Sequence, residues 1–178
     1  MLSVRRIKDI TELQELAADW NRLADGNPIR SYAWHSNWWK HYGEGSELYV
    51  LAVQDAQQAI VGIAPWFIEQ QSRQGRVVAW LGSGEVCSDH QSLLVAEQNA
   101  DTVAEALAEW LDAADSEDSW DLLHLDAVAI HDVPVTKLVA QFWSGGHTVH
   151  RDDGTNCWRS ALPATWEEYV NSLSKSHR

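Results

Sequence analysis

The sequence predicts an α/β or α+β fold in which helices cover both faces of a sheet. Short apolar runs typical of strands follow one another through the first half of the chain, and amphipathic helical stripes are inserted among them. The chain has 178 residues, which is enough for one domain with a buried core. Apolar residues make up 45% and charged residues 22%, as in an ordinary folded domain.

The first half of the chain reads as a strand, two helices and a run of strands. Leu13, Leu16, Trp20 and Leu23 recur at helical spacing, and Gly43 ends an aromatic-rich second helix. Later, Pro65 stands inside an apolar run, which predicts a bulge or an edge position. In order we predict a strand at 2–7, helices at 11–23 and 33–42, and strands at 48–53, 60–68, 76–81 and 90–95.

The second half alternates helices with short strands. Pro134 is placed for the first turn of a helix, and Thr165 with Glu168 has the spacing of a capping box. That last helix has no stop signal before Arg178, so we expect the natural sequence to continue beyond it. We predict helices at 100–114, at 135–143 and from 165 onward, and strands at 122–127, 148–151 and 157–162.

Charge and composition exclude several classes of function. Thirteen basic and 26 acidic residues give a net charge of −13, which argues against binding nucleic acid or an anionic membrane surface. No apolar run is long enough for a membrane span, the first residues lack a secretory signal, and two cysteines cannot form a disulfide scaffold. We therefore expect a cytoplasmic protein. Eleven Trp residues fit either a Trp-rich core or interface, or a cleft that binds sugars or other rings.

One loop gathers side chains that can do chemistry. Glu85, Cys87, Asp89 and His90 follow a predicted strand, so His90 or Glu85 is a candidate general base or substrate ligand. The alternative is a polar loop whose Asp89 caps backbone N–H groups, and nucleophilic catalysis by Cys87 is a third interpretation. Eight histidines are present, but their spacing matches no metal motif, and we expect no metal.

Several segments together carry a family pattern. They are Trp20-Asn21-Arg22-Leu23; Ser31-Tyr32-Ala33-Trp34; Val61-Gly62-Ile63-Ala64-Pro65; Trp80-Leu81-Gly82-Ser83-Gly84 leading to Ser88-Asp89-His90; Trp120-Asp121-Leu122-Leu123-His124-Leu125; and Thr165-Trp166-Glu167-Glu168-Tyr169 followed by Leu173-Ser174-Lys175-Ser176-His177-Arg178. In this order they resemble the N-terminal half of the CelD-like proteins, two-lobed members of the GNAT acetyltransferase superfamily associated with cellulose and exopolysaccharide biosynthesis. The resemblance covers nearly the whole chain. It implies an α/β fold with a GNAT-like mixed, largely antiparallel sheet.

The resemblance also implies a domain plan and an activity. Residues 1–164 would form the N-terminal lobe, and 165–178 would begin a helix leading to a second GNAT-like lobe that is absent from this chain. The parent protein would transfer acetyl from acetyl-CoA to an amine or hydroxyl of a small, sugar-like acceptor, while the isolated lobe would be inactive. The open-ended helix is also a candidate surface for a homodimer.

The chain departs from the family at the site for acetyl-CoA. GNAT enzymes hold the pyrophosphate in a glycine-containing loop before a helix, where backbone N–H groups approach the anion. The equivalent stretch here, 95–102, has no glycine and carries Glu97 and Asp101, which would repel a diphosphate. We therefore expect this lobe to shape the acceptor side and not to bind CoA.

The remaining predictions concern the acceptor. If this lobe contributes to the site, we expect Trp66 to offer a stacking surface and Glu85, Asp89 and His90 to contact the substrate; no catalytic residue is assigned. Two alternatives stay open. The chain could be a scaffold lobe without catalytic function, or half of a FemAB-type aminoacyl transferase, although its acidic charge disfavours contact with tRNA.

Overall fold

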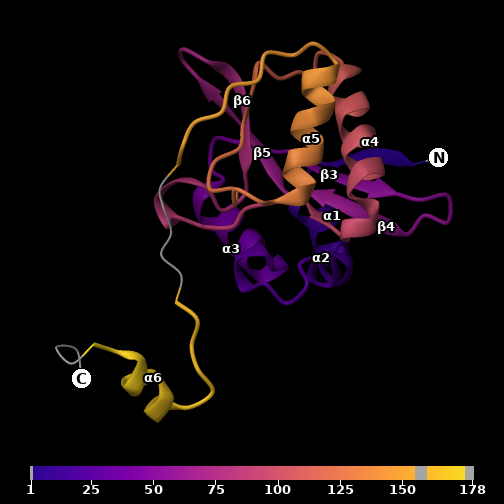
Figure 1. Cartoon of the computed structure of the whole chain (residues 1–178). Coiled ribbons are helices and arrows are strands. Elements are labelled where there is room, and N and C mark those ends of the chain that lie inside the picture. The colour runs from indigo at the N-terminus through magenta and orange to yellow at the C-terminus, as the bar shows by residue number, and fades with distance from the viewer. Residues whose placement is uncertain (1, 155–159, 175–178) are drawn as a thin grey trace.

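The structure is a computed structural model that describes residues 2–154 and 160–174. It confirms the predicted fold class, because helices cover both faces of a mixed, largely antiparallel arrangement of strands (Figure 1). Two helices, α4 and α5, lie side by side on one face, and α1–α3 cover the other. The helices are α1 (Ile10–Glu15), α2 (Ala17–Leu23), α3 (Tyr32–Tyr42), α4 (Ala100–Asp112), α5 (Val133–Ser144) and α6 (Trp166–Ser172).

The strands form two four-stranded sheets, ordered β1-β3-β4-β7 and β2-β5-β6-β8. Every pair of neighbouring strands is antiparallel except β6 and β8, which are parallel. One parallel pair among antiparallel neighbours agrees with the mixed, largely antiparallel sheet that the family resemblance implied. The strands are β1 (Ser3–Ile7), β2 (Glu47–Leu48), β3 (Val50–Gln54), β4 (Ile60–Ala64), β5 (Trp66–Gln71), β6 (Gly75–Trp80), β7 (Leu94–Val95) and β8 (Leu122–His124).

The two sheets meet at Pro65, which separates β4 from β5. Proline has no N–H to donate, so it interrupts the ladder at the position where the sequence predicted an irregularity. Hydrogen bonds continue across the junction: Leu81 N donates to Pro65 O at 2.8 Å and Tyr49 N donates to Trp66 O at 3.1 Å. The strands therefore act as one bent layer between the two groups of helices.

The strand layer separates two apolar clusters. Along β3, Leu51 and Val53 point toward α4 and α5, while Val50 and Ala52 point toward α1–α3, because side chains alternate along a strand. The cluster under α4 and α5, which we call the α4–α5 core, contains Trp66 and other fully buried side chains. The cluster under the early helices is called the α1–α3 core.

Helix α4 packs directly over β4 at Gly62. A Cβ atom on residue 62 would lie 2.6 Å from Val103 Cγ1, so glycine is what allows this close approach. The predicted apolar stripe of α4 is confirmed, since Val103, Ala104, Leu107 and Leu111 are all buried. Residue size at one strand position thus sets the distance between helix and sheet.

Several sequence predictions need correction. The predicted helix 11–23 is two helices that meet at Leu16, and the predicted strand 90–95 shrinks to β7. Residues 148–151 and 160–162 form no strand; the rest of the predicted strand 157–162 lies outside the described residues. The segment 148–154 is too polar to bury alternate side chains against the core.

The last helix begins as predicted. Thr165 Oγ1 accepts a hydrogen bond from Glu168 N at 3.2 Å, and the Glu168 carboxylate accepts from Thr165 N at 3.3 Å, which completes the capping box. Figure 1 shows α6 apart from the strand layer and the helices that cover it. Trp166 is 70% exposed and its ring packs on that of Tyr169, with the centroids 5.4 Å apart.

Candidate functional site

A long loop leaves the sheet after β6. Trp66 of β5 pairs with Trp80 of β6. Three residues before Trp66, Ile63 of β4 pairs with Leu94 of β7, which comes fourteen residues after Trp80. Eleven residues are therefore looped out of an otherwise continuous antiparallel pair. We call residues 81–93 the 81–93 loop. It follows the carboxyl end of a strand that pairs in parallel with β8, and such ends are where α/β sheets bind ligands.

The backbone of this loop is strained. Gly82 has a φ of 97°, and the non-glycine residues Cys87 and His90 have φ of 49° and 59°. Across from the loop, Ala127 has a φ of 52°, and its carbonyl accepts a hydrogen bond from Gln91 N at 3.0 Å. A left-handed conformation costs a non-glycine residue about 1–2 kcal/mol, so the surrounding structure must hold these residues in place.

Helix α3 provides two of the side chains that hold the loop. Trp34 and Trp38 are four residues apart and so lie on the same face of the helix. The indole N–H of Trp34 donates to Ser88 Oγ at 2.9 Å, and that of Trp38 donates to Ser83 O at 3.1 Å. Ser31 caps the start of α3 by accepting from Trp34 N at 3.2 Å.

Arg30 and Asp132 hold the other end of the loop. Arg30 Nε donates to His90 O at 2.6 Å, and one of its terminal nitrogens lies 3.3 Å from Asp132 Oδ2. The other oxygen of Asp132 accepts from Ser92 Oγ at 2.9 Å and from Val135 N at 3.0 Å, so the same carboxylate caps α5. Asp132 is buried, and removing any one partner would leave part of its charge unsatisfied.

Beneath the loop lies a buried pair, His35 and Gln91. Burial lowers the pKa of His35 to about 4, although the Gln91 side chain and the Leu81 carbonyl nearby favour the protonated ring. The imidazole is therefore neutral at pH 7. Gln91 Nε2 donates to Leu81 O at 3.1 Å, but within the described part of the chain Gln91 Oε1 and both ring nitrogens of His35 make no hydrogen bond of good geometry.

The predicted site residues Glu85, Asp89 and His90 are all exposed on this loop. Among the described residues, none of their side chains forms a hydrogen bond or an ion pair, so all three are available to a ligand. Asp89 does not cap a backbone N–H there. Cys87 is a free, exposed thiol whose Sγ lies 3.6 Å from Glu85 O.

The fourth predicted residue, Trp66, lies elsewhere. Its side chain has no exposed surface and packs against Trp80 in the α4–α5 core, with ring centroids 5.8 Å apart. In this structure Trp66 offers no ring face to a ligand, because β5 is covered on both sides. Its indole N–H has no hydrogen-bond partner among the described residues.

The start of α4 is where a GNAT enzyme would hold a pyrophosphate. Here a short 3₁₀ turn, Glu97–Asn99, runs into the helix, and no glycine occurs in 95–102. The Asp101 carboxylate lies in the first turn of α4, 2.8 Å from Lys137 Nζ. Acidic side chains in the first turns of the 3₁₀ segment and of α4, together with the lack of glycine, do not fit a diphosphate.

Sequence reasoning did not single out Arg30, His35, Gln91 or Asp132. Only Asp132 carried a local signal, because an acidic residue two positions before Pro134 is a helix N-cap pattern. Within residues 2–154 and 160–174, no three His, Cys, Asp or Glu side chains come together to hold a metal ion. No helix in that part of the chain is long and apolar enough to cross a membrane.

Comparison with known proteins finds similarity only at the level of structure. No protein-family model and no curated protein matches the sequence. Similar solved structures include an aminoglycoside 6'-N-acetyltransferase, AAC(6')-Ih, from Acinetobacter baumannii (11% identity, TM-score 0.48, 92% of this chain and 100% of that chain). Another is a spermidine N-acetyltransferase from Vibrio cholerae, solved with CoA and spermine (13% identity, TM-score 0.34, 61% of this chain and 62% of that chain).

Proposed function

We propose that this chain is the acceptor-side lobe of a GNAT-type acyltransferase that acetylates an amine or hydroxyl of a sugar-like molecule in polysaccharide or cell-envelope synthesis. One observation carries the proposal. The 81–93 loop, which contains most of the family-like segment of residues 80–90, is held in a strained conformation by hydrogen bonds from Trp34, Trp38 and Arg30, while Glu85, Asp89 and His90 face solvent. Strain maintained in this way is typical of functional sites.

The exposed side chains suit an acceptor that carries an amine. The carboxylates of Glu85 and Asp89 can bind an ammonium group, and the protein's net charge of −13 attracts a cationic molecule. The amine must lose a proton before it can act as a nucleophile, and the His90 imidazole can accept that proton. A hydroxyl acceptor would use the same base.

The acetyl donor belongs to another part of the protein in this proposal. Because the start of α4 does not fit a diphosphate, we expect acetyl-CoA to be held by the second GNAT-like lobe that the family resemblance implies. Residues 1–164 then form the first lobe, and residues 165–178 lead to the second. The exposed Trp166 and the half-buried Tyr169 of α6 are candidate contacts for that lobe or for a second copy of the chain.

Calorimetric titration tests whether acetyl-CoA binds to this chain or only to a protein that also contains the second lobe. The ligand is titrated into this chain and, in parallel, into a two-lobed protein that contains it. We expect binding to the two-lobed protein only. Binding to this chain alone would overturn the assignment of the acceptor side, and binding to neither protein would favour the scaffold or the FemAB-type alternative.

A substitution at His90 tests the acceptor site. His90→Asn retains a residue that tolerates the left-handed backbone but removes the base, so we expect kcat/KM for acetyl transfer by the two-lobed protein to fall about 100-fold. Cys87→Asn is the matched control, because residue 87 is also exposed and left-handed on the same loop. Full activity of His90→Asn would reject the role of His90, and inactivity of Cys87→Asn alone would indicate thiol catalysis.

A further inference from the structure

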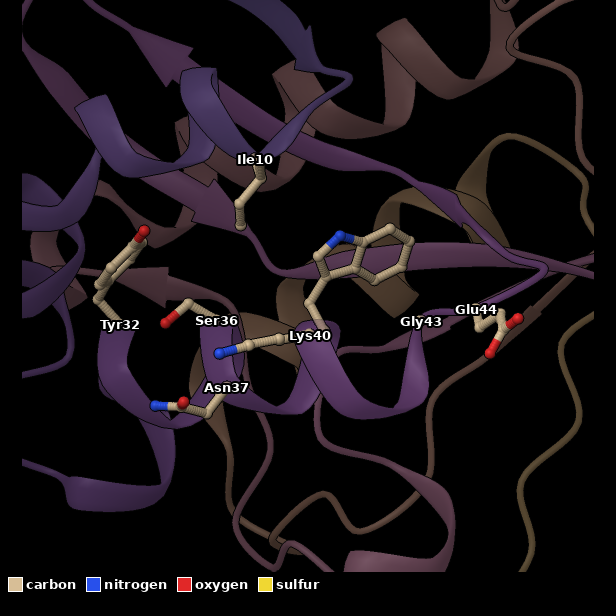
Figure 2. A pocket seen from close by; sticks show the side chains of 8 residues that line it. Ile10, Tyr32, Ser36, Asn37, Lys40, Gly43 and Glu44 are labelled. Atoms are coloured by element: carbon tan, nitrogen blue, oxygen red, sulfur yellow. The ribbon is translucent and has the colours of Figure 1, made fainter.

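A groove lies beside α3, away from the face that holds the 81–93 loop. Figure 2 shows Ile10 of α1 on one side of the groove and Ser36, Asn37 and Lys40 of α3 on the other. Its volume is about 540 Å³, which is in the range of sites for small molecules. The residues lining it are Ile10, Tyr32, Ser36, Asn37, Trp39, Lys40, Gly43 and Glu44.

The half-buried indole of Trp39 is held in a fixed position in this groove. A Cβ atom on residue 43 would lie 2.5 Å from Trp39 Cε3 and 2.7 Å from Cδ2, so the ring lies against the glycine backbone. Only glycine allows this contact, and the contact restricts the ring. The indole N–H forms no hydrogen bond with any described residue. Trp39 therefore provides a rigid aromatic surface with a donor at its edge.

Several polar groups around the indole have no partner among the described residues, although Ser36 Oγ donates to Ala33 O at 3.4 Å. Asn37 Nδ2 donates to Ala33 O at 2.7 Å, which leaves Oδ1 free to accept. Within the described residues, Tyr32 OH, Lys40 Nζ and the Glu44 carboxylate have no hydrogen-bond or ion-pair partner. The contrast with the other described lysines is clear, since both Lys8 and Lys137 form ion pairs, at 2.6 and 2.8 Å.

We propose that this groove binds an uncharged, polyhydroxylated ring, namely a sugar residue of a saccharide. Hydroxyl groups both donate and accept, so they match the Lys40 ammonium and the Glu44 carboxylate at the same time. The apolar face of the sugar ring would cover the indole of Trp39. A purely apolar ligand would strip water from these polar groups without replacing it, and a polyanion would meet a protein of net charge −13.

The inference does not depend on acyl transfer. Trp34 and Trp38 contact the 81–93 loop, whereas the groove involves Tyr32, Ser36, Trp39 and Gly43. A saccharide bound here would therefore occupy a site separate from Glu85, Asp89 and His90. Titration with acetyl-CoA and titration with sugar can succeed or fail independently of each other.

The test follows the indole N–H signals of the ¹⁵N-labelled chain by NMR while cellobiose or maltose is added. We expect one of the two sugars to shift the Trp39 signal in a saturable way. Trp39→Ala should weaken binding about tenfold or more, and Asn37→Ala about threefold. The matched control is Trp143→Ala, because Trp143 is 70% exposed on α5, and it should bind like the unmodified protein.

Two results would overturn the proposal: no shift of the Trp39 signal with either sugar, or unchanged affinity in Trp39→Ala. Circular dichroism checks that each variant is folded. If Trp39→Ala does not fold, the double variant Asn37→Ala with Lys40→Met changes only exposed positions of α3 and should weaken binding about tenfold. Unchanged affinity in that double variant would equally reject the groove as the site.

Discussion

The two faces of the strand layer are built from different kinds of contact. The α4–α5 core consists of apolar and aromatic side chains, and the Arg6 guanidinium lies over the Tyr49 ring at its edge, 4.8 Å from the ring centroid. On the α1–α3 side, a comparable apolar core is joined at its edge by buried polar side chains under the 81–93 loop, including His35, Ser88 and Gln91. Each of these buried polar groups costs free energy unless it finds a partner.

This difference suggests that one side mainly stabilises the fold and that the other mainly holds the 81–93 loop in position. The α4–α5 core contributes to the free energy of folding through the burial of large apolar side chains, which is the main favourable term. The polar side chains next to the α1–α3 core instead fix the 81–93 loop through directional hydrogen bonds, such as those from Trp34 and Arg30. Variants on the two sides should therefore fail in different ways.

The largest effect is expected in the α4–α5 core. Trp66→Ala removes a fully buried ring and should lower the free energy of unfolding by about 3–5 kcal/mol, as measured by urea denaturation. Trp143→Ala, at an exposed position, should change it by less than about 0.5 kcal/mol. Equal, small losses in both variants would contradict the assignment of stability to this face.

The second effect depends on pH and on His35. Its pKa is about 4 in the folded protein and about 6.5 when exposed, so only the unfolded chain takes up a proton between these values. The neutral ring contributes about 3 kcal/mol to the free energy of unfolding. This contribution is complete above pH 6.5 and is lost as the pH falls to 4. The free energy of unfolding is measured against pH for the unmodified protein and for His35→Gln, and the difference between the two curves isolates the contribution of His35. Parallel curves would refute it.

A smaller effect is expected at Asp132. Asp132→Ala removes the cap of α5 and the partner of Arg30 and Ser92, and should cost about 2–3 kcal/mol. The loss should be local: hydrogen exchange should accelerate in the 81–93 loop and in the first turn of α5 more than in α4. Ser92→Ala serves as a milder control, with an expected cost of about 1 kcal/mol. Uniform acceleration throughout the chain would argue against a positioning role.

The smallest effect separates backbone strain from crowding within the loop. Gly82 and Gly84 both have positive φ, 97° and 81°, so alanine at either position costs about 1 kcal/mol or more. Only at Gly82 would a Cβ meet neighbours, 2.7 Å from Gln91 Nε2 and 3.1 Å from Ser88 Oγ. Gly82→Ala should therefore cost about 1 kcal/mol more than Gly84→Ala in urea denaturation. Equal costs would mean that the polar cluster moves aside freely.

Local sequence patterns correctly predicted features that depend on interactions between residues close together in the chain. The stripe of α4 and the capping box of α6 were confirmed because both depend on residues within one or two turns of helix. The separation of β4 from β5 at Pro65 followed from the chemistry of a single residue. The prediction of a strand at 148–151 was wrong because a strand also needs a partner strand and a core to cover. The residues of the segment itself do not show whether either is present.

The loop residues Glu85, Asp89 and His90 stand out in the sequence because they follow a strand and carry reactive groups, and their contact with a substrate stays a prediction. Their supports could not, since Arg30 reaches His90 across 60 residues and Asp132 across 102. Trp66 was misplaced for a related reason. Its strand is covered on both faces, and residue spacing alone does not show which ring stays accessible.

The looped-out segment has an evolutionary consequence. Pairing on either side of it, Trp66 with Trp80 and Ile63 with Leu94, does not depend on how many residues lie between. Doubling the length of such an insertion costs only about 0.6 kcal/mol in closure entropy. The scaffold can thus exchange or lengthen this segment while its strands stay in register. Under the proposed function, acceptor specificity could then change separately from the fold.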